Sequence, residues 1–283
     1  MSRFIQFLTV TVLGCSTVCV DAAGLVEVDL ELVLAADVSQ SMDSTELKIQ
    51  RDGYSSALSD PSFIRAVQAG MLGRIAVTYV EWAGAERQNV VVNWQVIDSI
   101  QSARDFALQV NASARDPARG TSISGALNFG LRMIESNDFE GLRKVIDISG
   151  DGPNNDGRYV LLARADAAAD GVVVNGLPII VPGAGVFGNL DDYYADCVIT
   201  GPGAFSLPAY GIEAFALAIR RKHSDVLSSF FACFLPILAA YYPLLMSSLD
   251  RAKAGSFPPS SVWLANIFFA LWGLWLLRRV LRY

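Results

Sequence analysis

Apolar residues in the first two thirds of the chain form short continuous runs, separated by stretches with an apolar residue every three to four positions. The runs are rich in Val, Ile and Leu and predict strands at Val26–Ala35, Arg74–Trp82, Val90–Ile97, Lys144–Ser149 and Val172–Ile179. The stretches between them predict helices at about Ser44–Leu58, Ala103–Ala112, Ser124–Ser136 and Arg158–Ala169. This alternation indicates an α/β fold with a mostly parallel sheet covered by helices on both faces.

One pair of strands departs from the alternation. The runs at 74–82 and 90–97 are joined only by the short segment Gly84–Gln88, which is typical of an antiparallel hairpin. We therefore expect one antiparallel edge strand in an otherwise parallel, doubly wound sheet. The weaker pattern that follows predicts a loop at Val181–Gly188, a short helix at Leu190–Val198, a last strand at Gly203–Leu207 and a closing amphipathic helix at Ile212–Arg221.

The last 60 residues have a different pattern. Val226–Leu249 contains no charged residue and is interrupted only by Pro236 and Pro243. A second apolar run, Val262–Leu277, is followed by Arg278 and Arg279, and counting on to Leu281 gives the ~20 residues that a membrane span requires. These runs predict a C-terminal transmembrane helical hairpin at about 226–249 and 262–281, within a membrane tail at 223–283. The sheet domain is expected at 24–222.

The first 23 residues resemble an export signal. Arg3 precedes the apolar stretch Phe4–Val20, and small residues follow at 21–23. A lipoprotein is the alternative, because Cys15 ends an approximate lipid-attachment pattern. Either one predicts an exported protein of the cell envelope.

The charge and the cysteine content argue against nucleic-acid-binding, disulfide-rich and zinc-binding proteins. The chain has 28 acidic and 22 basic residues, and five of the basic ones lie in the last 60 positions. The acidic sheet domain therefore lacks the clustered Lys and Arg that nucleic-acid binding needs. Two of the four cysteines, Cys15 and Cys19, lie in the expected signal, so the remaining pair offers no disulfide framework and no zinc spacing.

The first candidate functional residues lie at the end of the first predicted strand. Asp37, Ser39 and Ser41 follow the apolar run at alternate positions of a strand-to-helix loop. One carboxylate and two hydroxyls are hard oxygen ligands, the kind that Mg²⁺ and Mn²⁺ prefer. Three such ligands cannot saturate an octahedral ion, so further oxygen ligands must come from elsewhere in the chain.

Two later loops offer those ligands. Thr121 lies where a helical pattern opens, and Asp151 follows the strand at 144–149. Loops at the carboxyl ends of strands converge at one edge of an open α/β sheet, so we expect all five residues to meet there. Glu81 ends its strand at the same edge, where it either orients a bound water or pairs with a nearby arginine. Trp82 and Trp94 are expected to pack in the core.

The five residues Asp37, Ser39, Ser41, Thr121 and Asp151 resemble the metal-ion-dependent adhesion site (MIDAS) of von Willebrand factor A domains. Six segments also resemble a bacterial family of exported A-domain proteins, the domain of unknown function DUF1194: Glu27–Ser41, Gln50–Leu58, Gly73–Gly84, Gly120–Ser124, Ile146–Asn155 and Gly201–Phe205. The resemblance covers about residues 26–222 and implies the A-type fold and a cation at these five residues. It implies direct ligation by the serines, sometimes also by the threonine, and action of the aspartates largely through water. The family brings no established biochemical role.

The tail resembles a different family. Ser256–Asn266 and Leu271–Arg279 are similar to the last two transmembrane helices of lipopolysaccharide-export permeases. The resemblance covers only about 60 residues and lacks that family's other membrane helices and periplasmic domain. It therefore does not carry transport activity over to this chain.

Three functions follow as hypotheses. The first is a non-enzymatic protein-binding module for adhesion or assembly, in which an unknown partner protein presents a carboxylate to the bound Mg²⁺ or Mn²⁺. The second is a membrane transport or assembly subunit related to lipopolysaccharide export. The third is an enzyme that uses Asp37 as phosphoryl acceptor, which is disfavoured because Ser39 stands where such chemistry usually has a second carboxylate. An A-type fold whose site holds no cation is the remaining alternative.

Overall fold

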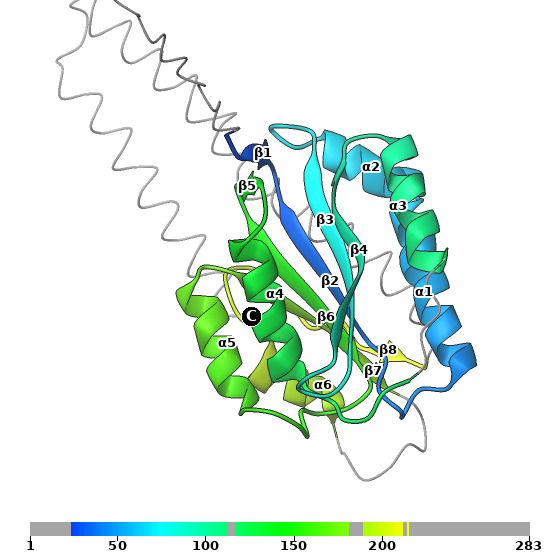
Figure 1. The fold of residues 1–283 in the computed structure, drawn as a ribbon, viewed down its shortest axis with the longest axis vertical. Helices are drawn as coiled ribbons and strands as arrows, with labels where there is room; N and C mark the ends of the chain where they lie inside the picture. The colour runs from blue at the N-terminus through cyan, green and yellow to red at the C-terminus, as the bar shows by residue number, and fades with distance from the viewer. Residues whose placement is uncertain (1–23, 113–116, 181–188, 212–213, 215–283) are drawn as a thin grey trace, which may run out of the picture.

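The computed structural model describes residues 24–112, 117–180, 189–211 and 214. Its centre is a six-stranded sheet in the order β4-β3-β2-β6-β7-β8, in which only β4 runs antiparallel to its neighbour (Figure 1). The strands are β2 (Glu31–Asp37), β3 (Ile75–Trp82), β4 (Gln88–Ile97), β6 (Lys144–Gly150), β7 (Val173–Ile180) and β8 (Ala209–Tyr210). The expected α/β class, with a mostly parallel sheet and one antiparallel edge strand, is confirmed.

Helices cover both faces of the sheet (Figure 1). One face carries α1 (Ser44–Leu58), α2 (Pro61–Gln68) and α3 (Ile100–Ala112). The other carries α4 (Ile123–Glu135), α5 (Val160–Ala169), α6 (Leu190–Tyr193) and the π-helix η1 (Tyr194–Val198). Successive side chains of β2 alternate between the two hydrophobic cores, because side chains of a strand point to opposite faces. β2 is therefore buried on both sides over its whole length.

The structure corrects the predicted strand Val26–Ala35. The segment is broken at Asp29 and Leu30 into β2 and a separate β1 (Val26–Val28), which pairs with β5 (Phe139–Gly141) in a two-stranded sheet. The Asp29 carboxylate accepts hydrogen bonds from the amides of Leu72 and Arg74 at the break. The local sequence pattern does not show this interruption, since it depends on hydrogen bonds from Leu72 and Arg74, which lie far along the chain.

Two further predictions need correction. Helix α2 was not predicted, although Asp60 caps it by accepting a hydrogen bond from the Ser62 amide and Pro61 occupies its first position. The last strand lies at Ala209–Tyr210 and not at Gly203–Leu207, where the chain makes only a single bridge from Ser206 to Gly176. The predicted helix at Leu190–Val198 is present as α6 and η1.

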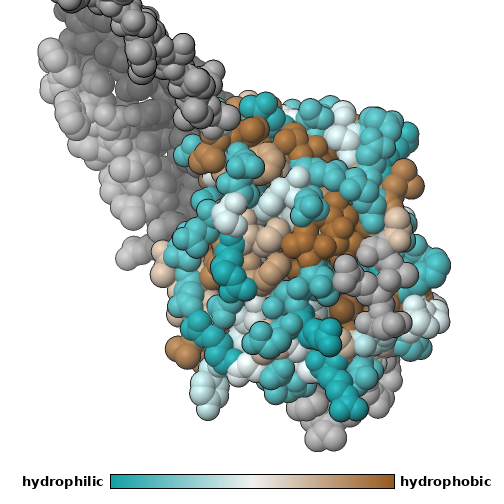
Figure 2. Space-filling model, viewed as in Figure 1, coloured by the Kyte–Doolittle hydropathy of each residue, from teal (hydrophilic) through white to brown (hydrophobic). Residues whose placement is uncertain are grey.

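The two ends of the sheet have different surfaces. Five of the ten exposed large hydrophobic side chains of the described residues belong to β1, the residue before it or loops at the end where β2 begins: Leu25, Val26, Met71, Leu72 and Leu142. Figure 2 shows hydrophobic patches near this end, at the top of the view, and mainly hydrophilic residues at the opposite end. The polar end is the one where β2 and β6 finish.

Several predictions fall outside the described residues. They are the export signal at 1–23, the loop at Val181–Gly188, the helix at Ile212–Arg221 (of which only residue 214 is described), and the membrane tail with its helices at about 226–249 and 262–281. Within the part of the chain that is described, no helix combines the length and apolar character needed to cross a membrane.

Candidate metal site

Asp37 ends β2 and is fully buried. Its Oδ1 accepts a hydrogen bond of 2.8 Å from the Ser39 amide, which folds the chain back directly after the strand. The loop then enters α1 through a capping box: the Asp43 carboxylate accepts from the amides of Thr45 and Glu46, and Glu46 accepts from the Asp43 amide. The segment that carries Ser39 and Ser41 is therefore fixed at both ends.

The two serines connect this loop to Asp151. Ser39 Oγ and Ser41 Oγ lie 2.9 Å apart, and Ser41 Oγ donates to Asp151 Oδ1 at 2.8 Å. Asp151 directly follows β6, the strand that pairs with β2. Ser39 is buried whereas Ser41 is exposed, so the cluster reaches solvent on the Ser41 side.

Thr121 lies on the third loop, before α4. The Ala118 amide donates to the Val38 carbonyl, which places this loop against the segment from Asp37 to Ser39. The Thr121 amide donates to Asn155 Oδ1, and the Asn155 amide donates back to the Thr121 carbonyl, so the loop also contacts the segment after Asp151. Asp37, Ser39, Ser41 and Asp151 thus form one hydrogen-bonded cluster, with Thr121 on the loop beside it.

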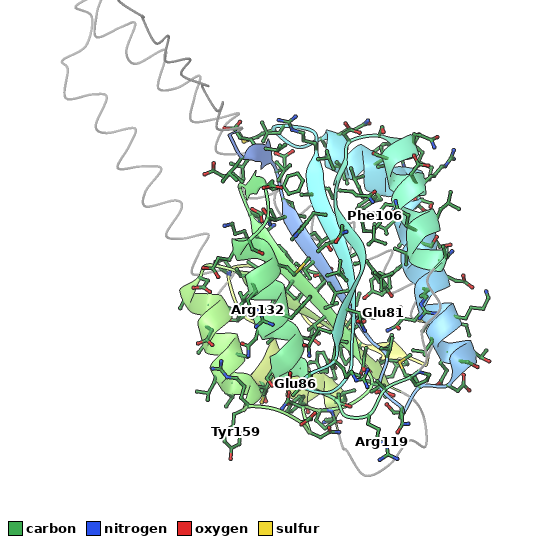
Figure 3. All side chains as sticks on the ribbon, in the orientation of Figure 1. Glu81, Glu86, Phe106, Arg119, Arg132 and Tyr159 are labelled. Carbon is green, nitrogen blue, oxygen red and sulfur yellow. The ribbon has the colours of Figure 1, made fainter. Side chains whose placement is uncertain are left out.

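The surrounding rim carries charges of both signs. Glu86 and Arg119, which are both exposed, lie at the same lower end of the molecule as these loops (Figure 3). Glu81 lies further inside the molecule, on β3 (Figure 3).

The electrostatics of the cluster are unbalanced. Burial first, and the neighbouring Asp151 carboxylate second, raise the pKa of Asp37 from its ordinary 3.8 to about 8, although hydrogen bonds to Ser39 partly lower it. Burial also raises the pKa of Asp151, and the hydrogen bond from Ser41 offsets part of that effect. Asp37 Oδ2 is buried and has no hydrogen-bond partner among the described residues.

No basic side chain compensates these acids within the described residues. The three ion pairs found there join Lys48 to Asp52, Arg51 to Glu81 and Arg158 to Asp166. A buried carboxylate without a counter-charge is costly, and a bound cation would supply that charge. The oxygen-only donor set fits a hard ion such as Mg²⁺. No group of three or more His, Cys, Asp or Glu able to hold a metal occurs in the described ranges, and a site with two carboxylates and several hydroxyls does not need one.

The sequence left two alternatives for Glu81, and the structure shows that it pairs with an arginine. Its Oε1 lies 2.7 Å from Arg51 Nε of α1, and both side chains are buried. Trp82 is fully buried in the core under α4 and α5. Trp94 packs against the same core and donates to the Met133 carbonyl.

Two neighbours of Asp37 were not singled out from the sequence. They are Gly150, the last residue of β6, and Tyr194, the first residue of η1. Gly150 lies within the segment Ile146–Asn155 but was given no role, and Tyr194 belongs to no motif and lies far from Asp37 along the chain. Only the packing of η1 against the sheet brings its hydroxyl to the end of β6.

Residues 27–228 match the model of a family described as protein of unknown function (DUF1194). A comparison with curated proteins finds no match.

Several solved structures share the fold at low sequence identity. The pilus adhesin SpaC from Lactobacillus rhamnosus GG is 14% identical with a TM-score of 0.53, and the match covers 73% of this chain and 32% of SpaC. Proximal thread matrix protein 1 from the mussel byssus, in a form with a zinc-occupied MIDAS motif, is 13% identical with a TM-score of 0.51, covering 71% of this chain and 46% of that protein. A von Willebrand factor type A protein from Catenulispora acidiphila has a TM-score of 0.49 at 15% identity, covering 70% and 42%.

This chain spans less than half the length of each of these proteins. The comparison of folds rests on the two with TM-scores above 0.5, and at such identities it shows the fold alone.

Proposed function

This chain belongs to the family DUF1194, and on that premise we propose that it is a non-enzymatic protein-binding module of the bacterial envelope that depends on a divalent cation. The cation is Mg²⁺ or Mn²⁺, and the partner is a protein that presents a carboxylate.

One observation carries this proposal. Asp37 is fully buried, lies close to a second carboxylate and keeps one oxygen without a hydrogen-bond partner among the described residues. A fold gains nothing from such an arrangement on its own, since uncompensated buried charge is destabilising. A cation at the cluster would turn the same arrangement into a favourable one.

The residues that would hold the ion are Asp37, Ser39, Ser41, Thr121 and Asp151. A bound ion supplies a positive charge that can accept an oxygen ligand from outside the chain. Few negative charges lie close to it, because two of the side chains in the hydrogen-bonded cluster are neutral hydroxyls. The ion therefore keeps an attraction for an acidic group, and the exposed Ser41 leaves the cluster accessible to that group.

The structural neighbours are consistent with this proposal. SpaC is a pilus adhesin, and the MIDAS motif of the mussel byssus protein is described as holding zinc. Those properties belong to those proteins, and for this chain they support only the choice of hypothesis. Export and membrane attachment remain proposals that rest on the sequence of residues 1–23 and 223–283.

The test uses the full-length chain, solubilised in mild detergent, as bait for envelope proteins in Mg²⁺ or in chelator. We expect a partner to be retained in Mg²⁺, released by chelator and lost with Asp37→Asn. Asp43→Asn is the matched control, because it removes the same charge near the site while asparagine caps a helix as well as aspartate does. Capture that is equal in chelator, or equal with Asp37→Asn, would refute cation-dependent binding.

A further inference from the structure

Tyr194 reaches the cation site from an element that belongs to none of its three loops. It begins η1, which packs on the same face of the sheet as α4 and α5, and its side chain is fully buried. The ring lies against β7, since a Cβ on Gly176 would stand 2.7 Å from Tyr194 Cδ1. The ring is therefore held firmly, and the position of the hydroxyl is set by the fold.

The hydroxyl lies next to Asp37. A Cβ on Gly150 would stand 2.8 Å from the Tyr194 hydroxyl oxygen and 3.0 Å from Asp37 Oδ2. Both atoms therefore border the same small space, which exists because residue 150 has no side chain. Any other residue at this position would fill the space and push the two oxygens apart.

The two atoms are complementary and both lack partners. Asp37 Oδ2 and the Tyr194 hydroxyl are both buried, and neither has a hydrogen-bond partner among the described residues. A carboxylate oxygen accepts hydrogen bonds and a phenol donates one. A buried donor or acceptor that is left unsatisfied destabilises the fold, so a donor and an acceptor that border one space have a strong reason to pair.

We propose that Tyr194 is a positioning residue of the cation site, whose hydroxyl donates to Asp37 Oδ2 directly or through one water molecule and so orients the charged carboxylate toward the bound ion. This inference rests on the cation site of the proposed function. Polar contacts too long for a direct hydrogen bond are commonly bridged by water. Groups that orient metal ligands in this way typically contribute 10–100-fold to metal affinity.

The decisive variant is Tyr194→Phe, which keeps the ring and removes only the hydroxyl. Calorimetric titration of the full-length protein with Mg²⁺ should give a dissociation constant about 10-fold higher than that of the wild type. Tyr79→Phe is the matched control. Tyr79 is also fully buried with a hydroxyl that has no described partner, but its ring packs edge-on against Tyr54 of α1, on the other face of the sheet. This control should bind Mg²⁺ as the wild type does.

A second variant and a spectroscopic measurement separate positioning from a general effect on folding. Gly150→Ala fills the space between the two oxygens and should weaken Mg²⁺ binding while every hydroxyl is retained. In the wild type, Mg²⁺ should shift the tyrosine absorption to the red as the hydroxyl donates to a fully charged carboxylate, and Tyr194→Phe should lose that shift. Melting curves in chelator check that each variant is folded.

The outcomes distinguish this inference from the proposed function. If the wild type binds neither Mg²⁺ nor Mn²⁺, the cation site itself is wrong. If the wild type binds and Tyr194→Phe has the same affinity, or if no tyrosine absorption changes on binding, the site stands and the role of Tyr194 is refuted.

Discussion

The two ends of β2 each carry a fully buried acid, and the two carboxylates differ in how completely they are hydrogen-bonded. At the start of the strand, Glu31 has both carboxylate oxygens satisfied: the Gly141 amide donates to Oε1 at 2.7 Å and Asn137 Nδ2 donates to Oε2 at 2.6 Å. At the end of the strand, Asp37 has one oxygen bonded to the Ser39 amide and the other without a described partner.

The difference shows how an acid that the fold satisfies can be distinguished from a candidate cation ligand. Glu31 ties β2 to the segment around β5 and uses its full hydrogen-bonding capacity within the fold. Asp37 uses only part of its capacity and lies beside Asp151, which makes its charged form costly. Burial alone is the same at both positions, so the informative property is the balance of hydrogen bonds and charge around each carboxylate.

The largest expected effect is at Asp37. Asp37→Asn should weaken Mg²⁺ binding more than about 100-fold, because it removes one of the two carboxylates of the cluster. In chelator the same variant should melt at a higher temperature than the wild type at neutral pH, since the raised pKa of the buried Asp37 makes folding of the wild type costly and asparagine avoids that cost. Titration calorimetry and melting curves measure both effects. A variant with normal affinity, or one that is less stable in chelator, would show that the two ends of β2 do not differ as described.

Glu31→Gln is the corresponding change at the other end. Its amide NH₂ must face either Asn137 or the Gly141 amide, so one donor meets another and the unfolding free energy should fall by about 1–3 kcal/mol. Affinity for Mg²⁺ should not change, because Glu31 lies at the opposite end of the strand. Chemical denaturation together with calorimetry tests this pair of results. A loss of Mg²⁺ affinity without a loss of stability would reverse the assignment of the two acids.

The smallest expected effect on the site comes from the largest change in the chain. Removal of residues 224–283 should leave a soluble protein with unchanged affinity for Mg²⁺, since every residue of the cluster lies between positions 37 and 151. Size-exclusion chromatography and titration measure the outcome. Aggregation or unfolding of the shortened chain would mean that the tail belongs to the core, and the division into a sheet domain and a tail would be wrong.

Local patterns in the sequence were sufficient for the central strands of the sheet and for much of the cluster, whereas β5 and the position of β8 were not predicted. Central strands such as Lys144–Gly150 are largely apolar, and the end of each strand marks the edge where polar side chains collect. For that reason Asp37 and Asp151 could be expected at one edge without knowledge of any contact. The hairpin of β3 and β4 was likewise evident from the short segment that joins them.

Contacts between distant elements could not be obtained in this way. The sequence left Glu81 with two alternatives, and only the packing of α1 on β3 brings Arg51 to it. The break in the predicted strand at Asp29 depends on amides of the loop before β3, and the nearness of Tyr194 to Asp37 depends on how η1 packs.

The sequence alone indicated most of the strands and helices and the loops that carry the candidate oxygen ligands, because hydrophobic periodicity and turn residues act over a few neighbouring positions. The tertiary structure decided which buried polar atoms are satisfied and which are left without a partner. Hydrogen-bond partners such as Asn137 for Glu31, and neighbours such as Tyr194 for Asp37, come from segments far along the chain, and only the packed fold brings them within reach.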